Sequence, residues 1–255
     1  MKKQILLTTN NAKTIKSLKV NDVETQLPFL TYILYMSPFT QNSKGINVCS
    51  HASKGCAESC LVGSGNGGMF ENVYQGRVKK TEHFLRDRVG FLFQVKEEIE
   101  KAIKKNKDKV ILTIRLNGTS DLPYEKYKVF EGKNIFEIFP DVQFYDYTKN
   151  YLRFDKELPK NYHLTFSRSE INHKKSMELL KRGFNVAMVM TKLVSTYKGF
   201  KVVNGDETDL RFTDPKNVIV GLKYKKMTKK GANNNLGIES GFVIDTKIKE
   251  IDNVV

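Results

Sequence analysis

Hydrophobic side chains along this chain come in short runs separated by polar or helical stretches. Five of these runs have the length and the β-branched or aromatic content of buried strands: residues 29–39, 109–116, 142–147, 162–167 and 184–190. Strands that read as near-continuous apolar runs are typical of parallel sheets, because helices cover such sheets on their faces. The pattern therefore predicts parallel strands joined by helical or irregular connections.

Two stretches between these runs have the period of a helix. Between residues 77 and 105 the apolar positions recur at a spacing of three to four, which predicts one long amphipathic helix or a kinked pair broken near Gly90. Residues 172–183 begin with polar side chains and stop at Gly183, which predicts a second, shorter helix.

Strand and helix signals in this order predict an α/β fold. We expect a closed or partial β/α barrel of the TIM type, formed by a single domain over residues 1–255. Residues 1–28 are expected to form an N-terminal arm or edge strand. Turn signals at Asn204-Gly205 and Asp214-Pro215 predict a C-terminal hairpin or extension within residues 192–255.

Composition limits the cellular setting and the partners. No apolar run is long enough to cross a bilayer and no secretory signal is evident, so we expect a cytoplasmic protein without a membrane partner. Forty-three Lys and Arg against 28 Asp and Glu give a formal charge of +15, which favours a nucleic acid as a partner. Against this, an AT-rich genome enriches Lys, Asn and Ile without any binding function, and the basic residues are spread along the chain.

All three cysteines lie in one polar stretch directly after the first predicted strand. Cys49, Cys56 and Cys60 could hold a zinc ion with His51 as the fourth ligand, or three irons of a four-iron cluster with one iron left open. The spacing C-x6-C-x3-C matches neither a zinc ribbon nor a usual ferredoxin, so it leaves the metal undecided. Three buried thiols acting as small hydrophobes are the plain alternative, and the polar neighbours argue against it.

The carboxyl ends of barrel strands form the active site of β/α barrels, so polar groups at these ends are candidates for chemistry. A glycine-rich segment after the cysteines adds backbone that can approach a ligand closely. We expect the following residues to bind substrate: Asn117, Ser120, Lys149, Ser167, Arg168, Gly65 and Gly67.

Three aspartates at these strand ends are the candidate catalytic acids. Cleavage of a glycosidic or N-glycosidic bond needs one ionised and one protonated carboxyl group, and Asp121 with Asp146 is the best pair, with Asp209 third. Asp121 could equally be a turn or cap residue. Asp146 lies inside an aromatic strand, where a carboxylate is costly unless it has a partner or a function.

Four strings resemble the phage-encoded family named for gene product 88 of a mycobacteriophage. They are C-S-H-A-S-x-x-C-x-x-x-C-L, R-L-N-G-T-S-D, F-Y-D-Y-T-K, and G-D-x-x-D-x-R with V-G-L-K, and they span residues 47–225. Some members of this group resemble the phage DNA-guanine transglycosylases, barrel enzymes similar to tRNA-guanine transglycosylase. The resemblance implies a transferase that exchanges guanine in DNA for a free 7-deazaguanine base.

In that mechanism a guanine leaves the base stack, and Asp121 or Asp146 attacks its deoxyribose C1′ while the other carboxyl group acts as acid and base. Asn117 and Ser120 would contact the purine edge, and zinc on the cysteines would be structural. tRNA-guanine transglycosylases, however, carry their zinc ligands after the barrel strands, whereas these cysteines follow the first strand.

The early cysteine loop resembles instead the position of the cluster loop in radical S-adenosylmethionine enzymes, which are also partial β/α barrels. In this second hypothesis Cys49, Cys56 and Cys60 bind a 4Fe-4S cluster whose open iron takes S-adenosylmethionine, although that family's usual spacing is C-x3-C-x2-C. A third hypothesis is a non-enzymatic, metal-stapled DNA-binding protein. On the sequence we rank base exchange ahead of the radical enzyme.

Overall fold

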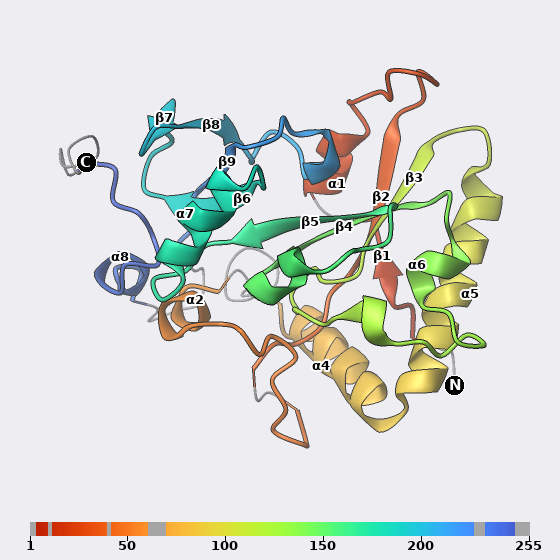
Figure 1. Ribbon diagram of the computed structural model, residues 1–255. Helices are drawn as coiled ribbons and strands as arrows, with labels where there is room; N and C mark the ends of the chain where they lie inside the picture. Colours follow the sequence, from red (N-terminus) through yellow and green to blue (C-terminus); the bar gives the residue numbers. More distant parts are fainter. Residues whose placement is uncertain (1–3, 10–11, 40–41, 61–69, 227–232, 248–255) are drawn as a thin grey trace.

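A mostly parallel β-sheet runs through the molecule (Figure 1). The computed structural model describes residues 4–9, 12–39, 42–60, 70–226 and 233–247. Nine strands lie in these ranges: β1 Leu7–Thr8, β2 Phe29–Leu34, β3 Ile111–Arg115, β4 Gln143–Thr148, β5 Tyr162–Ser167, β6 Val186–Met190, β7 Thr196–Tyr197, β8 Phe200–Asn204 and β9 Ile219–Lys223. All five predicted strands are confirmed, with bounds that differ by a few residues.

The sheet is open, so the closed form of the predicted barrel is wrong, and a partial barrel of the TIM type is not confirmed. Strand order is β1-β2-β3-β4-β5-β6-β9-β8-β7, and β2 to β6, β9 and β8 pair in parallel. The two edge strands are antiparallel to their neighbours and only two residues long. Such short edges cannot pair with each other to close a barrel, and the connections between β3, β4 and β5 carry only single helical turns instead of full helices.

Helical segments cover the sheet and form its loops (Figure 1). The α-helices are α1 Ala12–Ser17, α2 Lys54–Glu58, α4 Glu71–Arg86, α5 Arg88–Asn106, α6 Ile135–Ile138, α7 His173–Lys181 and α8 Leu236–Glu239, and the 3-10 turns are η2 Tyr124–Lys126, η3 Tyr151–Asp155 and η4 Arg211–Thr213. The predicted glycine stop of α7 is confirmed, since Gly183 has a φ of 90°.

The long amphipathic stretch forms two helices, α4 and α5, with a kink between them, which is the second of the two predicted forms. The break lies at Asp87 and not at Gly90, because Asp87 leaves the helical region at φ −140° and ψ 80°. Its side chain then accepts a hydrogen bond from the Gly90 N–H at 2.9 Å and caps α5. Because Gly90 has no Cβ, the Asp87 carboxylate can lie close to its backbone; the bend itself lies at Asp87.

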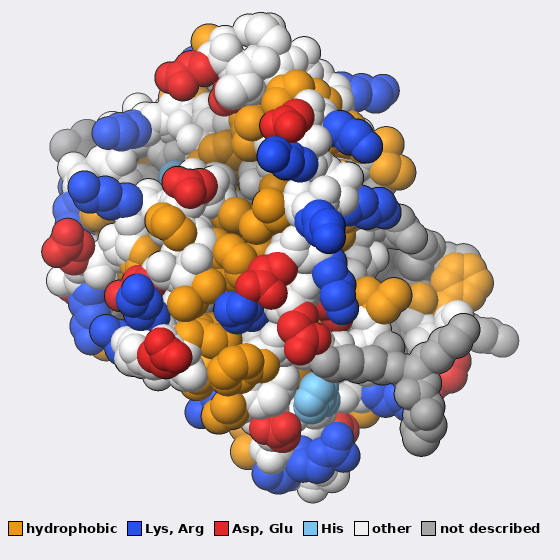
Figure 2. All heavy atoms as spheres, turned by 90° about the vertical axis from the view of Figure 1, so that its right-hand side faces the viewer, with side chains coloured by type: hydrophobic (Ala, Val, Ile, Leu, Met, Phe, Trp, Pro, Cys, Tyr) orange, Lys and Arg blue, Asp and Glu red, His pale blue; other side chains and the backbone are white. Residues whose placement is uncertain are grey.

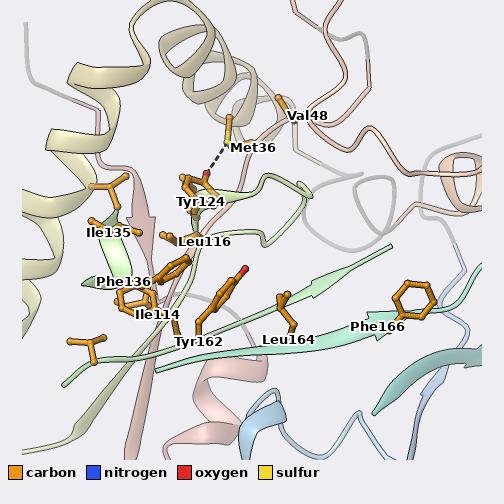
Figure 3. Packing of buried hydrophobic residues seen from close by; sticks show 14 of the residues in the cluster. Met36, Val48, Ile114, Leu116, Tyr124, Ile135, Phe136, Tyr162, Leu164 and Phe166 are labelled. Atoms are coloured by element: carbon orange, nitrogen blue, oxygen red, sulfur yellow. Dashed lines mark hydrogen bonds between the residues drawn. The ribbon is translucent and has the colours of Figure 1, made fainter. Parts of the chain in front are cut away.

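The two faces of the sheet differ in chemistry. On one face Ile114, Phe144 and Phe166 join side chains of α4, α5, α6 and α7 in a single hydrophobic core. Figure 3 shows part of this packing, where the rings of Phe136 and Tyr162 stack with centroids 4.0 Å apart. Alternation along the strands directs a polar set to the opposite face, which we call the polar face: Thr31, Thr113, Arg115, Tyr145, Tyr147, His163, Thr165 and Ser167.

A short hairpin does follow β6, but its turn is not the predicted one. Strands β7 and β8 pair antiparallel around Lys198 and Gly199, whose φ angles of 48° and 80° suit a tight hairpin turn. At Asn204-Gly205 the chain instead leaves β8 and returns through η4 to β9, which inserts in parallel between β6 and β8. Part of the predicted C-terminal extension is therefore a central strand of the sheet.

Charges on the surface are mixed. On the face shown in Figure 2, Lys and Arg side chains alternate with Asp and Glu, and hydrophobic side chains are exposed between them. Within the described ranges, no helix is long and apolar enough to cross a membrane.

Candidate functional site

The cysteine loop follows β2, the first strand of the parallel series, and is held by contacts with distant residues. Ser53 caps α2 by accepting from the Cys56 N–H. The Glu170 carboxylate, just after β5, accepts from the Ser53 hydroxyl at 2.7 Å and from the Gly55 N–H at 2.8 Å. These bonds fix the helix that carries Cys56 against the carboxyl end of the sheet.

The three thiols lie close enough to influence one another. All three side chains are half-buried. The pKa of Cys49 is raised to about 12, mainly by burial; Lys149 opposes this shift, and the neighbouring Asp121, Cys56 and Cys60 add to it. Without a metal, Cys49 is therefore a neutral thiol near pH 7.

The structure does not confirm the predicted metal-binding loop. Among the described residues, no three His, Cys, Asp or Glu side chains form a group that could hold a metal ion. The predicted ligand His51 is exposed, and its Nδ1 lies 3.1 Å from the Ser50 hydroxyl. The predicted ligand-binding glycines Gly65 and Gly67 lie outside the described residues.

Lys149 brings a positive charge to the cysteine loop. Its Nζ donates to the Ser167 hydroxyl at 2.9 Å, and its charge interacts with the nearby thiols of Cys56 and Cys49. Burial lowers the pKa of Lys149, and the nearby Cys56, Cys49 and Asp121 raise it to a net value above its usual one. Two predicted substrate-binding residues thus lie together beside two predicted metal ligands.

A buried ion pair occupies the polar face beside this group. Arg115 donates to Asp209 at 2.8 Å, and its guanidinium lies 4.7 Å from the centroid of the Tyr147 ring. The Tyr145 hydroxyl lies 3.5 Å from the same carboxylate. Asp209 has no exposed surface, so its carboxylate serves as the counterion of Arg115. Arg115 was not among the predicted site residues, although a cation at the end of an apolar strand is a usable signal.

Asp146 points to the opposite, helix-covered face and is 1 % exposed. Its carboxylate accepts from the Asn117 N–H at 2.8 Å, from the Asn117 side-chain amide at 3.2 Å and from the Tyr162 hydroxyl at 3.1 Å. Burial raises the pKa of Asp146 to about 7, although Arg115 and these donors act in the opposite direction. The side chain holds the loop after β3 in place.

Asp121 and Asn117 connect the loops that follow the first three parallel strands. The Asp121 carboxylate accepts from the Lys149 N–H at 2.9 Å, and its own N–H donates to the Val48 carbonyl. Arg153 lies 3.4 Å from the other Asp121 oxygen. Asn117 accepts from the Leu122 N–H at 2.8 Å and from the Ser120 hydroxyl, so both predicted purine-contacting residues bond within their own loop. Asp121 thus holds the backbone of Lys149 and of the loop before Cys49, and Asp146 and Asn117 hold the loop that carries Asp121.

Arg168, another predicted substrate-binding residue, holds the C-terminal segment. Its guanidinium donates to the carbonyls of Gly241 and Phe242, at 2.5 and 2.7 Å. Helix α8, which precedes these residues, packs on α2. Arg168 therefore connects the end of β5 to the segment that backs the cysteine loop.

The raised pKa of Asp146 predicts a pH-dependent stability. Because the folded-state pKa of about 7 exceeds the usual 3.8, the folded protein binds more protons between these values than the unfolded chain does. The stabilisation is fully present below the unfolded pKa and is lost as pH rises through 7. We expect the free energy of unfolding in urea to fall between pH 5 and pH 8 by an amount on the order of a few kcal/mol, and Asp146→Asn to flatten this fall.

The exposed Asp141→Asn provides the control for this profile, since Asp141 lies on the surface just before β4. It should keep the wild-type pH dependence. Identical slopes for Asp146→Asn and the wild type would show that Asp146 titrates normally.

Comparison with known proteins adds one finding. A family model described as gene product 88 matches residues 5–245, which is nearly the whole chain. No curated protein and no solved structure matches the chain.

Proposed function

We propose that this chain, a member of the gene product 88 family, is an iron–sulfur enzyme of the radical S-adenosylmethionine type. The observation that carries the proposal is the position of three neighbouring thiols in the long loop after β2, the first strand of a parallel series that follows chain order from β2 to β6. In proteins with an open α/β sheet, ligands bind at the carboxyl ends of the parallel strands, which is the edge where this loop lies.

We propose a four-iron cluster rather than a single zinc ion because the two place different demands on the arrangement of the thiols. A single zinc ion needs four ligands that converge on one point, with sulfur atoms about 2.3 Å from the metal. The described residues form no such group, and the exposed His51 bonds to Ser50. In a cluster each thiolate binds a different iron, so three cysteines suffice and need not converge on one point. Cys49, Cys56 and Cys60 would hold the cluster.

When bound, the cluster would supply an electron for the one-electron reduction of S-adenosylmethionine. The chain's own residues position and shield this site. Glu170 holds the helix that carries Cys56, and Asp121 holds the backbone of Lys149 and of the loop before Cys49. We assign substrate contact to the polar face beside the thiols, where Arg115 and Tyr147 remain partly exposed. The formal charge of +15 supports DNA as the partner.

Elemental analysis of the protein purified without oxygen tests the proposal. We expect about four irons per chain with matching acid-labile sulfide. About one zinc and no iron would refute the radical mechanism and favour a structural zinc. Metal-free protein that also takes up no iron and sulfide on reconstitution would show that the cysteines are ordinary half-buried thiols.

Base exchange in DNA is the second candidate, supported by the Asp146 pKa of about 7, which suits a group that gives and takes protons near neutral pH. Because Asp146 is 1 % exposed, attack on a deoxyribose would require the loop after β3 to open. Incubation of DNA with the protein and labelled 7-deazaguanine tests it: label enters DNA in the wild type and not with Asp146→Ala. If the wild type incorporates no label into DNA, this candidate is ruled out.

A further inference from the structure

Cations and tyrosine rings alternate across the carboxyl ends of the first parallel strands, on the polar face. The Arg77 guanidinium, from α4, lies 5.2 Å from the centroid of the Tyr35 ring, and Tyr35 directly follows β2. Arg115, the last residue of β3, lies 4.7 Å from the centroid of the Tyr147 ring on β4. Lys149 directly follows β4. We call these residues the cation–tyrosine row: Arg77, Tyr35, Arg115, Tyr147 and Lys149.

The register of the sheet places these side chains beside one another. Ile33 of β2 pairs with Arg115 of β3, and Tyr35 lies two residues beyond Ile33, on the same face. A Cβ atom at Gly118, three residues after Arg115, would lie 2.8 Å from the Tyr35 ring, so the ring covers the end of β3. Each member of the row keeps some exposed surface. Because neighbouring strands lie about 4.8 Å apart, the row from β2 to β4 is on the order of 10 Å long.

Among the described residues, two cations of the row have no carboxylate in contact with them. These are Arg77 and Lys149, whereas Arg115 pairs with Asp209. The Arg77 Nη1 is buried and, within the described ranges, has no hydrogen-bond partner. The Lys149 Nζ donates to a neutral group, the Ser167 hydroxyl, at 2.9 Å. A largely buried cation without a counterion costs free energy, and an anionic ligand would offset this cost.

Both cations are held in place before any ligand arrives. The Tyr35 ring packs against the Arg77 guanidinium, and the Lys149 N–H donates to the Asp121 carboxylate at 2.9 Å while its Nζ bonds to Ser167. Donors that are already positioned lose less entropy when a ligand binds. The row therefore offers fixed positive charges at a partly exposed edge of the sheet.

From this arrangement we infer that the cation–tyrosine row binds successive phosphate groups, those of a nucleic-acid strand or of a nucleoside triphosphate. Guanidinium and ammonium groups are the usual protein donors to phosphate. Consecutive phosphates of one DNA strand lie about 3.4 Å apart along the helix axis, so a row on the order of 10 Å long spans more than one of them. The inference rests on the proposed function for the polar face, whose substrate chemistry it names, and it does not depend on a metal.

Calorimetric titration of the protein as purified tests the inference with three probes: single-stranded oligothymidylate, thymidine triphosphate and thymidine. We expect at least one phosphate-bearing probe to bind about tenfold or more tightly than thymidine, and the probe that binds identifies the source of the phosphates. Arg77→Gln and Lys149→Gln should each weaken its binding about tenfold, because hydrogen bonds to charged groups are among the strongest. Each should also lower the slope of log Kd against log salt concentration by about 0.7 for a single strand.

Two kinds of control separate the row from a general effect of charge. Arg77→Lys and Lys149→Arg keep the charge and should keep the salt dependence of the wild type. Lys54→Gln removes one positive charge from α2, outside the row, and should leave the affinity unchanged, because the Lys54 side chain is 89 % exposed and is screened by solvent and salt.

The inference is overturned if neither phosphate-bearing probe binds more tightly than thymidine. It is also overturned if the folded Gln variants bind like the wild type, or if Lys54→Gln weakens binding as much as they do. Arg77→Gln and Lys149→Gln test the row separately, so if circular dichroism shows that one does not fold, the other decides. Failure of the proposed function is a separate outcome, since it shows as the absence of iron in the wild type, whereas phosphate binding needs no iron.

Discussion

Cys56→Ala is expected to abolish iron binding in protein reconstituted without oxygen. The cluster would lose one of its three thiolates, and the side chain that contacts Lys149 would disappear with it. Loss of an outer partner of a metal ligand already costs about 10–100-fold in affinity, so loss of the ligand itself should cost more. Iron and sulfide content, together with the visible absorption of the cluster, measure the effect. Cys49→Ala and Cys60→Ala should behave alike.

His51→Ala is the informative comparison for this experiment. His51 is exposed and its ring bonds to the neighbouring Ser50, so a cluster on three cysteines should load normally without it. A zinc site with His51 as the fourth ligand would instead lose its metal in this variant. If the wild type and Cys56→Ala contain the same amount of iron, the cysteines are not its ligands.

Arg153→Ala should give the largest loss of stability among single changes near the site. The guanidinium side chain is 4 % exposed and lies 2.7 Å from Glu125 and 3.4 Å from Asp121. It also donates to the Tyr162 hydroxyl at 3.0 Å. Removal leaves two largely buried carboxylates without their cation, which typically costs about 3–5 kcal/mol. Urea unfolding at neutral pH measures this loss.

Arg182→Ala is the control, because Arg182 also pairs with a carboxylate but at the surface. Arg182 and Asp155 are 45 % and 47 % exposed, and such pairs contribute less than about 1 kcal/mol. If both variants lose the same free energy of unfolding, the ion pairs of Arg153 contribute no more stability than a surface ion pair. The supporting role assigned to Asp121 beneath Lys149 would then lose its basis.

Local patterns predicted local structure well. The run at 162–167 coincides with β5, because an apolar run of strand length reflects burial of that segment wherever its neighbours lie. Gly183 ends α7 as expected, since its positive φ is a property of one residue. The clustering of Cys49, Cys56 and Cys60 was likewise visible in the sequence. These features depend on residues within a few positions of one another.

Pairings between distant residues could not be read from the sequence. The partner of Asp209 is Arg115, 94 positions away, and the residue that holds the Cys56 helix is Glu170, whose bond to Ser53 spans 117 positions. The direction of Asp146 was undetermined too. An acid in an aromatic strand is costly unless it is partnered, and only the register of β3, β4 and β5 shows that its partners are Asn117 and Tyr162.

Local sequence patterns were enough to identify the main strands and helices and to show that three thiols share one loop. Long-range packing sets the open form of the sheet, the insertion of β9 between β6 and β8, and the approach of Lys149 to Cys56. Periodicity records whether a side chain is buried, but not which distant side chain buries it. Strand order and register supply that information, and at the cysteine loop they bring together residues from the ends of β2, β4 and β5.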